Sequence, residues 1–316
     1  MKRAAACALL FVSALAWGQS YPAKPIRLFL TFSSGGQADL LARMVVEKMR
    51  ASMPQPILVE PRPGAGGNLA MEAVAKAPPD GTTLVFGTPA VAINGKLYKQ
   101  LGYDPLKELA PISLAAWGPY VVYASGTLPV NSIAELIAYA KAKPGELNYA
   151  SVGIGSGTHL AAVLFTLAAG VQITHVPDKG IQQVAPDLVS GAVHLTFNAF
   201  GPLAQFVQGG RVKMLATTAA RRVPQLADLP TIAETIPGFE AAGWYGFFTT
   251  AGTPREVLAR LNTEVVKALN DRELAERIEK MGLVPSPQTL DEAARFVAVE
   301  AEKWGRAVSA SGATAE

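Results

Sequence analysis

The chain has 316 residues, of which 50% are hydrophobic and 17% charged, and its formal net charge is +3 at pH 7. A charge so close to balance argues against nucleic acid or an acidic membrane surface as a partner. One cysteine excludes a framework of internal disulfides, and three histidines without metal-ligand spacing argue against a transition-metal site.

Residues 1–18 have the pattern of a cleavable secretory signal peptide. Lys2 and Arg3 precede an uncharged apolar run at 4–16, and small residues up to Gly18 allow cleavage. The run is shorter than the roughly 20 residues that a membrane span needs, and no later stretch is long and apolar enough. We therefore expect export to the periplasm. Removal of the two leader cations lowers the formal charge from +3 to +1.

The most informative stretch follows the leader, where apolar residues 28–32 end at a polar glycine turn and continue as an amphipathic helix. The turn consists of Ser33, Ser34, Gly35 and Gly36, and the expected apolar face of the helix is Leu40, Leu41, Met44, Val45 and Met49. Such a turn exposes backbone N–H groups at the positive end of a helix dipole. It therefore suits an anion such as a carboxylate or phosphate.

Strand-like and helix-like segments alternate along the mature chain, which favours an α/β fold with largely parallel sheets. The expected strands are 26–32, 56–59, 83–87, 120–124, 147–151, 172–176, 194–198, 212–217 and 244–249. A Ser or Thr followed three residues later by Glu marks four helix starts, at Ser132, Thr231, Thr253 and Thr289. At the third start, Pro254 is expected in the first helical position.

A second glycine turn, Gly-Ile-Gly-Ser-Gly-Thr-His, occupies residues 153–159. Both halves of the chain run through a strand, a glycine turn, a helix and a further strand that ends in a polar turn. We therefore expect two α/β lobes that hold an anion between them, with hinge crossings near 118–125 and 243–250. The expected boundaries are 19–122 and 244–316 for lobe I, and 123–243 for lobe II.

Motifs of other functional classes are absent from the sequence. The second turn does not match the dinucleotide-binding fingerprint, and neither a phosphate-binding loop nor a nucleophile elbow occurs, so we expect no cofactor. Ser156 and His159 can meet across one helical turn, which leaves open an exported α/β enzyme acting on a carboxylate or ester. Trp244 and Tyr245, at the expected return crossing, are either core aromatics or part of the cleft wall.

Eight segments together resemble the substrate-binding proteins of tripartite tricarboxylate transporters, also called the Bordetella uptake gene family. The resemblance extends over residues 21–305, nearly the whole mature chain, and the order and spacing of the segments make it specific. The segments are GGQAD at 35–39, EPRPGAGGN at 60–68, PDGTTL at 79–84, LNYAS at 147–151, GIGSGTHL at 153–160, HVPDKG at 175–180, LPTIAE at 229–234 and WYG at 244–246.

The resemblance implies a periplasmic, two-lobed binding protein of the Venus-flytrap type, without catalytic activity and expected to be a monomer. Its ligand would be a small organic carboxylate, delivered to a membrane permease or, in some members, to a sensor kinase. The ligand-binding residues that it implies are Ser33, Ser34, Gly35, Gly36, Gln37, Asp39, Thr88, Ser156, Gly157, Thr158, His159 and Asn198.

Three of these residues have a more specific expected role. Gly36 and Gly157 would act through their backbone, so that alanine at either position would obstruct the turn. Asp39 would cap its helix and fix the loop, because its charge would repel an anionic ligand.

The sequence also departs from the family pattern at three positions. Ser34 replaces the usual proline, which would either add a hydroxyl donor to the first turn or loosen the loop. Asp178 replaces the usual tyrosine, and its charge would disfavour a second ligand carboxylate nearby. Asn198 replaces the common aspartate, so our hypothesis is that the ligand is a plain carboxylic acid and not an amino acid with its ammonium group.

Overall fold

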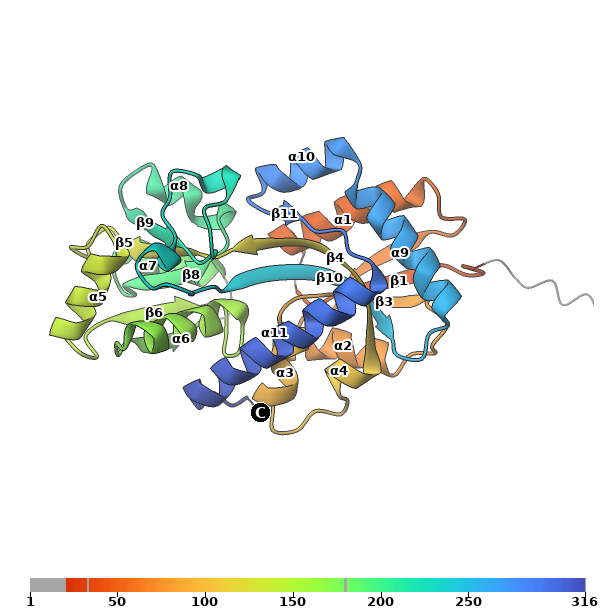
Figure 1. Cartoon of the computed structure of the whole chain (residues 1–316), viewed down its shortest axis with the longest axis horizontal. Coiled ribbons are helices and arrows are strands. Elements are labelled where there is room, and N and C mark those ends of the chain that lie inside the picture. The colour runs from red at the N-terminus through yellow and green to blue at the C-terminus, as the bar shows by residue number, and fades with distance from the viewer. Residues whose placement is uncertain (1–20, 33, 179–180, 316) are drawn as a thin grey trace, which may run out of the picture.

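The computed structural model describes residues 21–32, 34–178 and 181–315 (Figure 1). The expected signal peptide at 1–18 and Ser33 lie outside these residues. Two mixed sheets, each flanked by helices, form two lobes. None of the helices in the described part of the chain is long and apolar enough to cross a membrane.

The first lobe, on the right in Figure 1, is built on a six-stranded sheet in the order β11-β4-β10-β3-β1-β2. Its strands are β1 (Ile26–Leu30), β2 (Ile57–Pro61), β3 (Thr83–Gly87), β4 (Leu109–Pro119), β10 (Ala242–Thr250) and β11 (Val284–Pro285). Its helices are α1 (Gln37–Arg50), η2 (Ala65–Gly67), α2 (Asn68–Ala75), α3 (Ala90–Leu97), α4 (Pro105–Glu108), α9 (Arg255–Leu269), α10 (Arg272–Lys280) and α11 (Leu290–Ser311).

The second lobe is built on a five-stranded sheet in the order β7-β6-β8-β5-β9. Its strands are β5 (Val121–Ser125), β6 (Asn148–Ser151), β7 (Thr174–Pro177), β8 (Leu195–Asn198) and β9 (Val212–Thr217). Its helices are α5 (Ile133–Ala142), α6 (Gly157–Ala169), α7 (Ile181–Ser190), η3 (Gly201–Leu203), α8 (Ala204–Val207), η4 (Pro224–Leu226) and η5 (Ile232–Glu234).

Both sheets are mixed, whereas the sequence predicted largely parallel ones. The strands joined by crossover helices are parallel, as β1 is to β2 and β3, and β6 is to β7 and β8. The remaining neighbours are antiparallel: β10 pairs in this way with β3 and β4, β11 with β4, and β5 with β8 and β9. The expected α/β, two-lobed architecture is confirmed.

All nine predicted strands are present, but β4 and β11 were not predicted. The sequence of β4, LAPISLAAWGP, contains proline, glycine and alanine, which are rare in strands and hide its place between β10 and β11. On α1, Leu40 was expected in the apolar face but is 51% exposed. Ala38, Ala42 and Val46 are buried instead, beside Leu41, Val45 and Met49.

Three of the four predicted helix starts are confirmed. The side chain of Ser132 caps α5, and Thr231 and Thr289 form full capping boxes at η5 and α11. The expected cap at Thr253 is wrong, because the Thr253 hydroxyl donates to the Thr250 carbonyl at 2.7 Å and Pro254 takes the N-cap position of α9.

The two strands that carry the chain between the lobes are tied together by Thr218. The chain enters the second lobe at Tyr120, after β4, and returns through Ala241, before β10. Thr218 exchanges backbone and side-chain hydrogen bonds with Tyr120, including Tyr120 N–H to Thr218 Oγ1 at 2.8 Å. Its carbonyl accepts from the Ala241 N–H at 2.9 Å, and its hydroxyl donates to the Ala241 carbonyl. One fully buried threonine thus couples both crossings.

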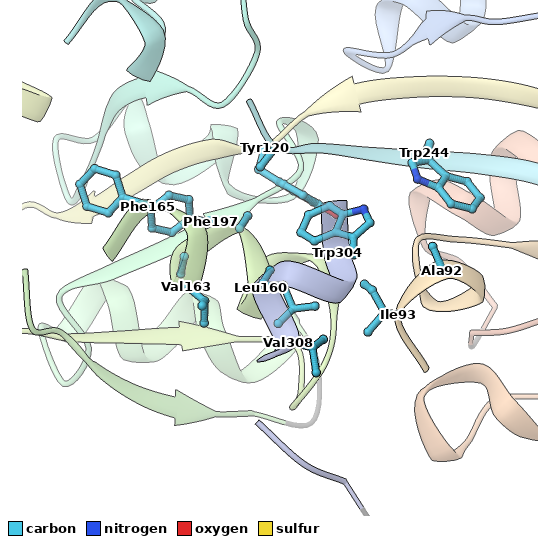
Figure 2. Packing of buried hydrophobic residues seen from close by; sticks show 14 of the residues in the cluster. Ala92, Ile93, Tyr120, Leu160, Val163, Phe165, Phe197, Trp244, Trp304 and Val308 are labelled. Atoms are coloured by element: carbon cyan, nitrogen blue, oxygen red, sulfur yellow. The ribbon is translucent and has the colours of Figure 1, made fainter. Parts of the chain in front are cut away.

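An apolar seam joins the lobes below these crossings. Figure 2 shows Trp304 and Val308 of α11 beside Leu160 of α6 and Ile93 of α3, all four buried in one cluster. Since α3 belongs to the first lobe and α6 to the second, α11 packs on both. We call these four residues the interlobe seam.

Glu300 anchors α11 to the return crossing. Its Oε2 accepts hydrogen bonds from the indole N–H of Trp244 on β10 at 2.8 Å and of Trp304 at 2.7 Å. Its other oxygen pairs with Lys303, and only 5% of the residue is exposed. A buried carboxylate with these partners is satisfied, and it fixes the direction of both indoles.

We predict that Glu300→Ala lowers the free energy of unfolding by about 2–5 kcal/mol, because it leaves two buried indole N–H groups without acceptors. Glu302→Ala is the matched control on the same helix, since Glu302 is exposed and pairs only with exposed Arg306. Urea unfolding monitored by fluorescence measures both. Equal stability of the two variants would contradict the anchoring role of Glu300.

Candidate functional site

A cavity of about 670 Å³ lies between the two lobes. Both lobes and the crossings contribute to its wall. The described lining residues are Thr31, Phe32, Ala38, Gly66, Thr88, Pro89, Ala90, Asn94 and Tyr98 from the first lobe, residues 152–158, Pro177, Asp178, Asn198 and Ala199 from the second, and Tyr120, Gly243, Trp244, Tyr245 and Ala315.

Three helices begin at this cavity. Ala38 lies in the first turn of α1, Ala90 is the first residue of α3, and Gly157 and Thr158 open α6. The first N–H groups of a helix have no acceptor within the helix, and the helix dipole is positive at this end. The described lining contains neither lysine nor arginine. Any attraction of these helix starts for an anion therefore comes from neutral backbone groups.

The turn before α6 is held by its own side chains. Ser156 caps the helix, since its Oγ accepts from the His159 N–H at 3.2 Å and donates to the Gly153 carbonyl at 2.7 Å. Thr158 Oγ1 accepts from the Val152 N–H at 3.2 Å. These bonds fix the backbone from which the N–H groups of Gly157 and Thr158 start the helix.

The Tyr120 hydroxyl lies so close to this turn that only glycine fits at position 157. A Cβ atom at Gly157 would collide with the Tyr120 hydroxyl, and one at Gly243 would lie 3.0 Å from it. Burial raises the pKa of Tyr120 above its ordinary value, so the group is a neutral O–H donor at pH 7. The sequence predicts Tyr120 only as the start of a strand, and its place in the cavity wall has no local signature.

Asn198 and Thr88 line the cavity at the ends of β8 and β3, close to where the sequence predicted them. Asn198 is 5% exposed, and its Oδ1 accepts from the Ala199 N–H at 2.9 Å. Its Nδ2 is buried and has no partner among the described residues. Because a buried donor without a partner is costly, this amide is suited to an acceptor inside the cavity.

The first glycine turn lies behind the cavity wall, which it reaches through Ala38. Ser34, Gly35, Gly36, Gln37 and Asp39 are not among the described lining residues. Asp39 does fix the loop as predicted, because its Oδ2 accepts from the Gly35 N–H at 2.9 Å and its Oδ1 pairs with Arg43 at 2.7 Å. It does not cap α1, whose N-cap residue is Gly36.

Two further residues of this turn have roles that the sequence did not show. Gln37 links the turn to the cavity wall by accepting from the Tyr245 hydroxyl at 3.1 Å and donating to the Met281 carbonyl at 2.8 Å. The expected obstruction by alanine at Gly36 is wrong, since its φ is −81° and a Cβ atom there would meet open space. Gly35, at φ +86°, is the residue that needs glycine.

His159 supports the second turn from behind and does not line the cavity. Its Nδ1 accepts from the Gly155 N–H at 3.1 Å, and its ring stacks on His175 with centroids 4.0 Å apart. His175 Nε2 in turn bonds Ser151 Oγ at 2.7 Å. The partners of the Ser156 hydroxyl are Gly153, Thr158 and the His159 backbone, so Ser156 and His159 do not form a serine–imidazole pair.

Burial lowers the pKa of both imidazoles to about 4, and for His175 the neighbouring His159 adds to the effect. Both rings are therefore neutral at pH 7, which allows His159 Nδ1 to accept the Gly155 N–H. Within the described residues, no group of three or more His, Cys, Asp and Glu side chains is arranged to hold a metal ion.

The two aromatic residues of the return crossing combine both expected roles. Trp244 is 1% exposed and belongs to the core, yet it also lines the cavity. Tyr245 is half-buried and lines the cavity beside it.

Comparison with known proteins shows which family this architecture belongs to. The family model described as "Tripartite tricarboxylate transporter family receptor" matches residues 41–313. Rpa4515 of Rhodopseudomonas palustris, solved with adipate, is 35% identical with a TM-score of 0.85, covering 93% of this chain and 99% of that one.

Two further solved structures are similar over almost their whole length. The periplasmic binding protein BugD is 31% identical with a TM-score of 0.81, covering 94% of this chain and 100% of its own. MatC of Rhodopseudomonas palustris, solved with malate, is 31% identical with a TM-score of 0.78, covering 91% of this chain and 100% of its own.

The two depressed imidazole pKa values predict a loss of stability in acid. The unfolded chain takes up protons on His159 and His175 near pH 6.5, whereas the folded protein does so only near pH 4. The contribution of the two neutral rings to the free energy of unfolding is therefore fully present above pH 6.5. It falls as the pH is lowered towards 4, by at most about 1.4 kcal/mol per pH unit for each ring. Urea unfolding at several pH values measures this fall.

The double variant His159→Asn/His175→Asn is the control, because it cannot take up protons at these positions. It should show a shallower fall than the wild type between pH 6.5 and 4.5. A wild-type stability that is constant over this range, or an identical fall in the double variant, would contradict the neutral imidazole pair.

Proposed function

This chain belongs to the tripartite tricarboxylate transporter receptor family, and we propose that it captures a small organic carboxylate between its lobes and delivers it to the permease of such a transporter. The observation that carries the proposal is the meeting of three helix N-termini at one cavity whose described lining has neither lysine nor arginine. The ligands solved with the two Rhodopseudomonas palustris relatives, adipate and malate, are both carboxylates.

The donors around the cavity suit an anion that must be released again. An ionised carboxylate that leaves water needs several hydrogen-bond donors, because unpaired burial of a charge is strongly unfavourable. The backbone N–H groups of Gly157 and Thr158, the amide of Asn198 and the hydroxyl of Tyr120 are available for this purpose. Neutral donors bind a carboxylate more weakly than a buried ion pair would, which suits a carrier.

In this proposal the expected ligand residues have two roles. Direct contact comes from Thr88, Gly157, Thr158 and Asn198, together with Tyr120. Support from behind comes from Ser34, Gly35, Gly36, Gln37 and Asp39 in the first turn, and from Ser156 and His159 in the second.

Closure of the lobes accompanies binding in this proposal. Gly155 of the second lobe packs directly on Leu97 of the first, so the described conformation is one in which the lobes touch. A ligand that contacts both lobes favours such a state over an open one, since it binds the closed state better.

The proposal also includes export of the chain, the membrane protein that receives the ligand, and the absence of catalysis. We infer that residues 1–18 direct the chain to the periplasm, where it acts as a monomer. The expected lobe boundaries, 122/123 and 243/244, lie within three residues of the crossings at Tyr120 and Ala241. Catalysis is not part of the proposal, since the His159 ring contacts the Gly155 backbone and has no bond to the Ser156 hydroxyl. A sensor kinase as the recipient is the alternative to a permease, and loss of uptake in cells lacking this protein separates the two.

We predict that only carboxylates stabilise the protein in a thermal-shift screen of acids, amino acids, sugars, phosphates and nucleotides, after unfolding and refolding to remove bound ligand. Acid at 100 times its dissociation constant adds about 2.7 kcal/mol, which raises the melting temperature by several degrees. A rise only with sugars or nucleotides would contradict the proposal. Turnover of the stabilising acid would favour the enzyme alternative.

We predict that Gly157→Ala weakens binding of the stabilising acid by at least about tenfold, because the added methyl collides with Tyr120 where the helix must meet the ligand. Gly36→Ala is the matched control, since its methyl meets open space at an ordinary φ, and its affinity should stay near that of the wild type. Isothermal titration calorimetry measures both. Equal affinities of the two variants would argue against binding at the start of α6.

A further inference from the structure

Asp178 is a carboxylate in the wall of a cavity that otherwise offers donors to an anion. It follows β7 directly, and its N–H donates to the Ser151 carbonyl at 3.0 Å, which fixes it beside the strand that leads into the second glycine turn. Its carbonyl lies 3.8 Å from the position that a Cβ atom would take at Gly153. Asp178 therefore borders the cavity from the same lobe as the start of α6.

The carboxylate of Asp178 is incompletely satisfied. Its Oδ2 is buried and has no hydrogen-bond partner among the described residues. Burial, followed by the charge of nearby Asp187, raises the pKa of this carboxyl above its ordinary value. Burial and a nearby like charge each disfavour the ionised form of this carboxyl.

The wall of the cavity thus offers both hydrogen-bond donors and a charged acceptor. The helix starts, Tyr120 and Asn198 offer donors, whereas Asp178 offers an acceptor with a charge. A ligand with a carboxylate at one end and a hydrogen-bond donor at the other satisfies both parts. A ligand with carboxylates at both ends would place one of them against Asp178, and like charges in a confined site repel each other.

We propose that Asp178 determines specificity, so that the preferred ligand is a monocarboxylate with a hydroxyl at its far end and a dicarboxylate is disfavoured. This inference rests on the proposed carboxylate-binding function. A hydroxyl that donates to Asp178 forms a charge-assisted hydrogen bond, which is stronger than one between neutral groups. Asp178 therefore selects by attraction of the hydroxyl and by repulsion of the second carboxylate.

Two chain-length series of acids test the inference by isothermal titration calorimetry on refolded, ligand-free protein. The six-carbon series is 6-hydroxyhexanoate, hexanoate and adipate, and the four-carbon series is 4-hydroxybutanoate, butanoate and succinate. In the series that binds, the wild type should prefer the hydroxy acid to the diacid by at least about tenfold. The unsubstituted acid should lie between them.

Asp178→Asn removes the charge with little change in shape and adds an amide donor. The preference for the hydroxy acid over the diacid should fall to about threefold or less, or reverse. Asp187→Asn is the matched control, because it removes a neighbouring charge from a residue outside the described lining, and it should keep the wild-type preference. Asp178→Ser replaces Asp178→Asn if the latter does not give the melting curve of a folded protein.

The outcomes separate this inference from the proposed function. A wild type that binds diacids as tightly as hydroxy acids would overturn the inference and leave the carboxylate site intact. A preference that persists in both Asp178 variants would also overturn it. Failure of every acid in both series to bind the wild type would overturn the inference, and the thermal-shift screen then decides separately whether the carboxylate site stands.

Discussion

If this chain binds a carboxylate as proposed, the constraint that organises the molecule is the cost of removing an anion's charge from water without a partner cation. Several donors must converge on one point to offset that cost, and rigid surroundings must hold them there. The start of α6 meets this requirement, because Ser156 and Thr158 fix the turn with their own hydroxyls. Behind it, the neutral rings of His159 and His175 hold Gly155 and Ser151 in place. The site thus depends on a supported turn more than on any charged side chain.

The same constraint explains why the site is divided between two lobes. The helices α1 and α3 approach the cavity from the first lobe and α6 from the second, so all three converge only when the lobes touch. Hydrogen bonds and apolar packing hold the connections between the lobes in place. Thr218 couples the two crossings, and the interlobe seam places apolar side chains of α3, α6 and α11 in one cluster. The buried Glu300 ties α11 to Trp244, which itself lines the cavity. The wall of the cavity and the connection between the lobes are therefore parts of one packed unit.

Local patterns in the sequence predicted the parts of this structure that depend on local forces. The second glycine turn could be predicted from residues 153–158, because its cap, its glycines and its helix start are neighbours in the chain. The caps at Ser132 and Thr289 followed for the same reason. What escaped prediction depends on contacts between distant residues. Tyr120 is a site residue because it meets Gly157, and β4 is a strand because β10 and β11 flank it, in spite of its weak strand propensity. The stacking of His159 on His175 has no signature in either local sequence.

The central claim is that the backbone N–H groups at the start of α6 hold the ligand carboxylate. Nuclear magnetic resonance of the ¹⁵N-labelled protein, titrated with the carboxylate that stabilises it most, tests this directly. The account predicts that the amide protons of Gly157 and Thr158 move to lower field as the site fills, since each becomes a hydrogen-bond donor to an anion. Saturable binding of the acid with these two amide resonances unchanged would contradict it.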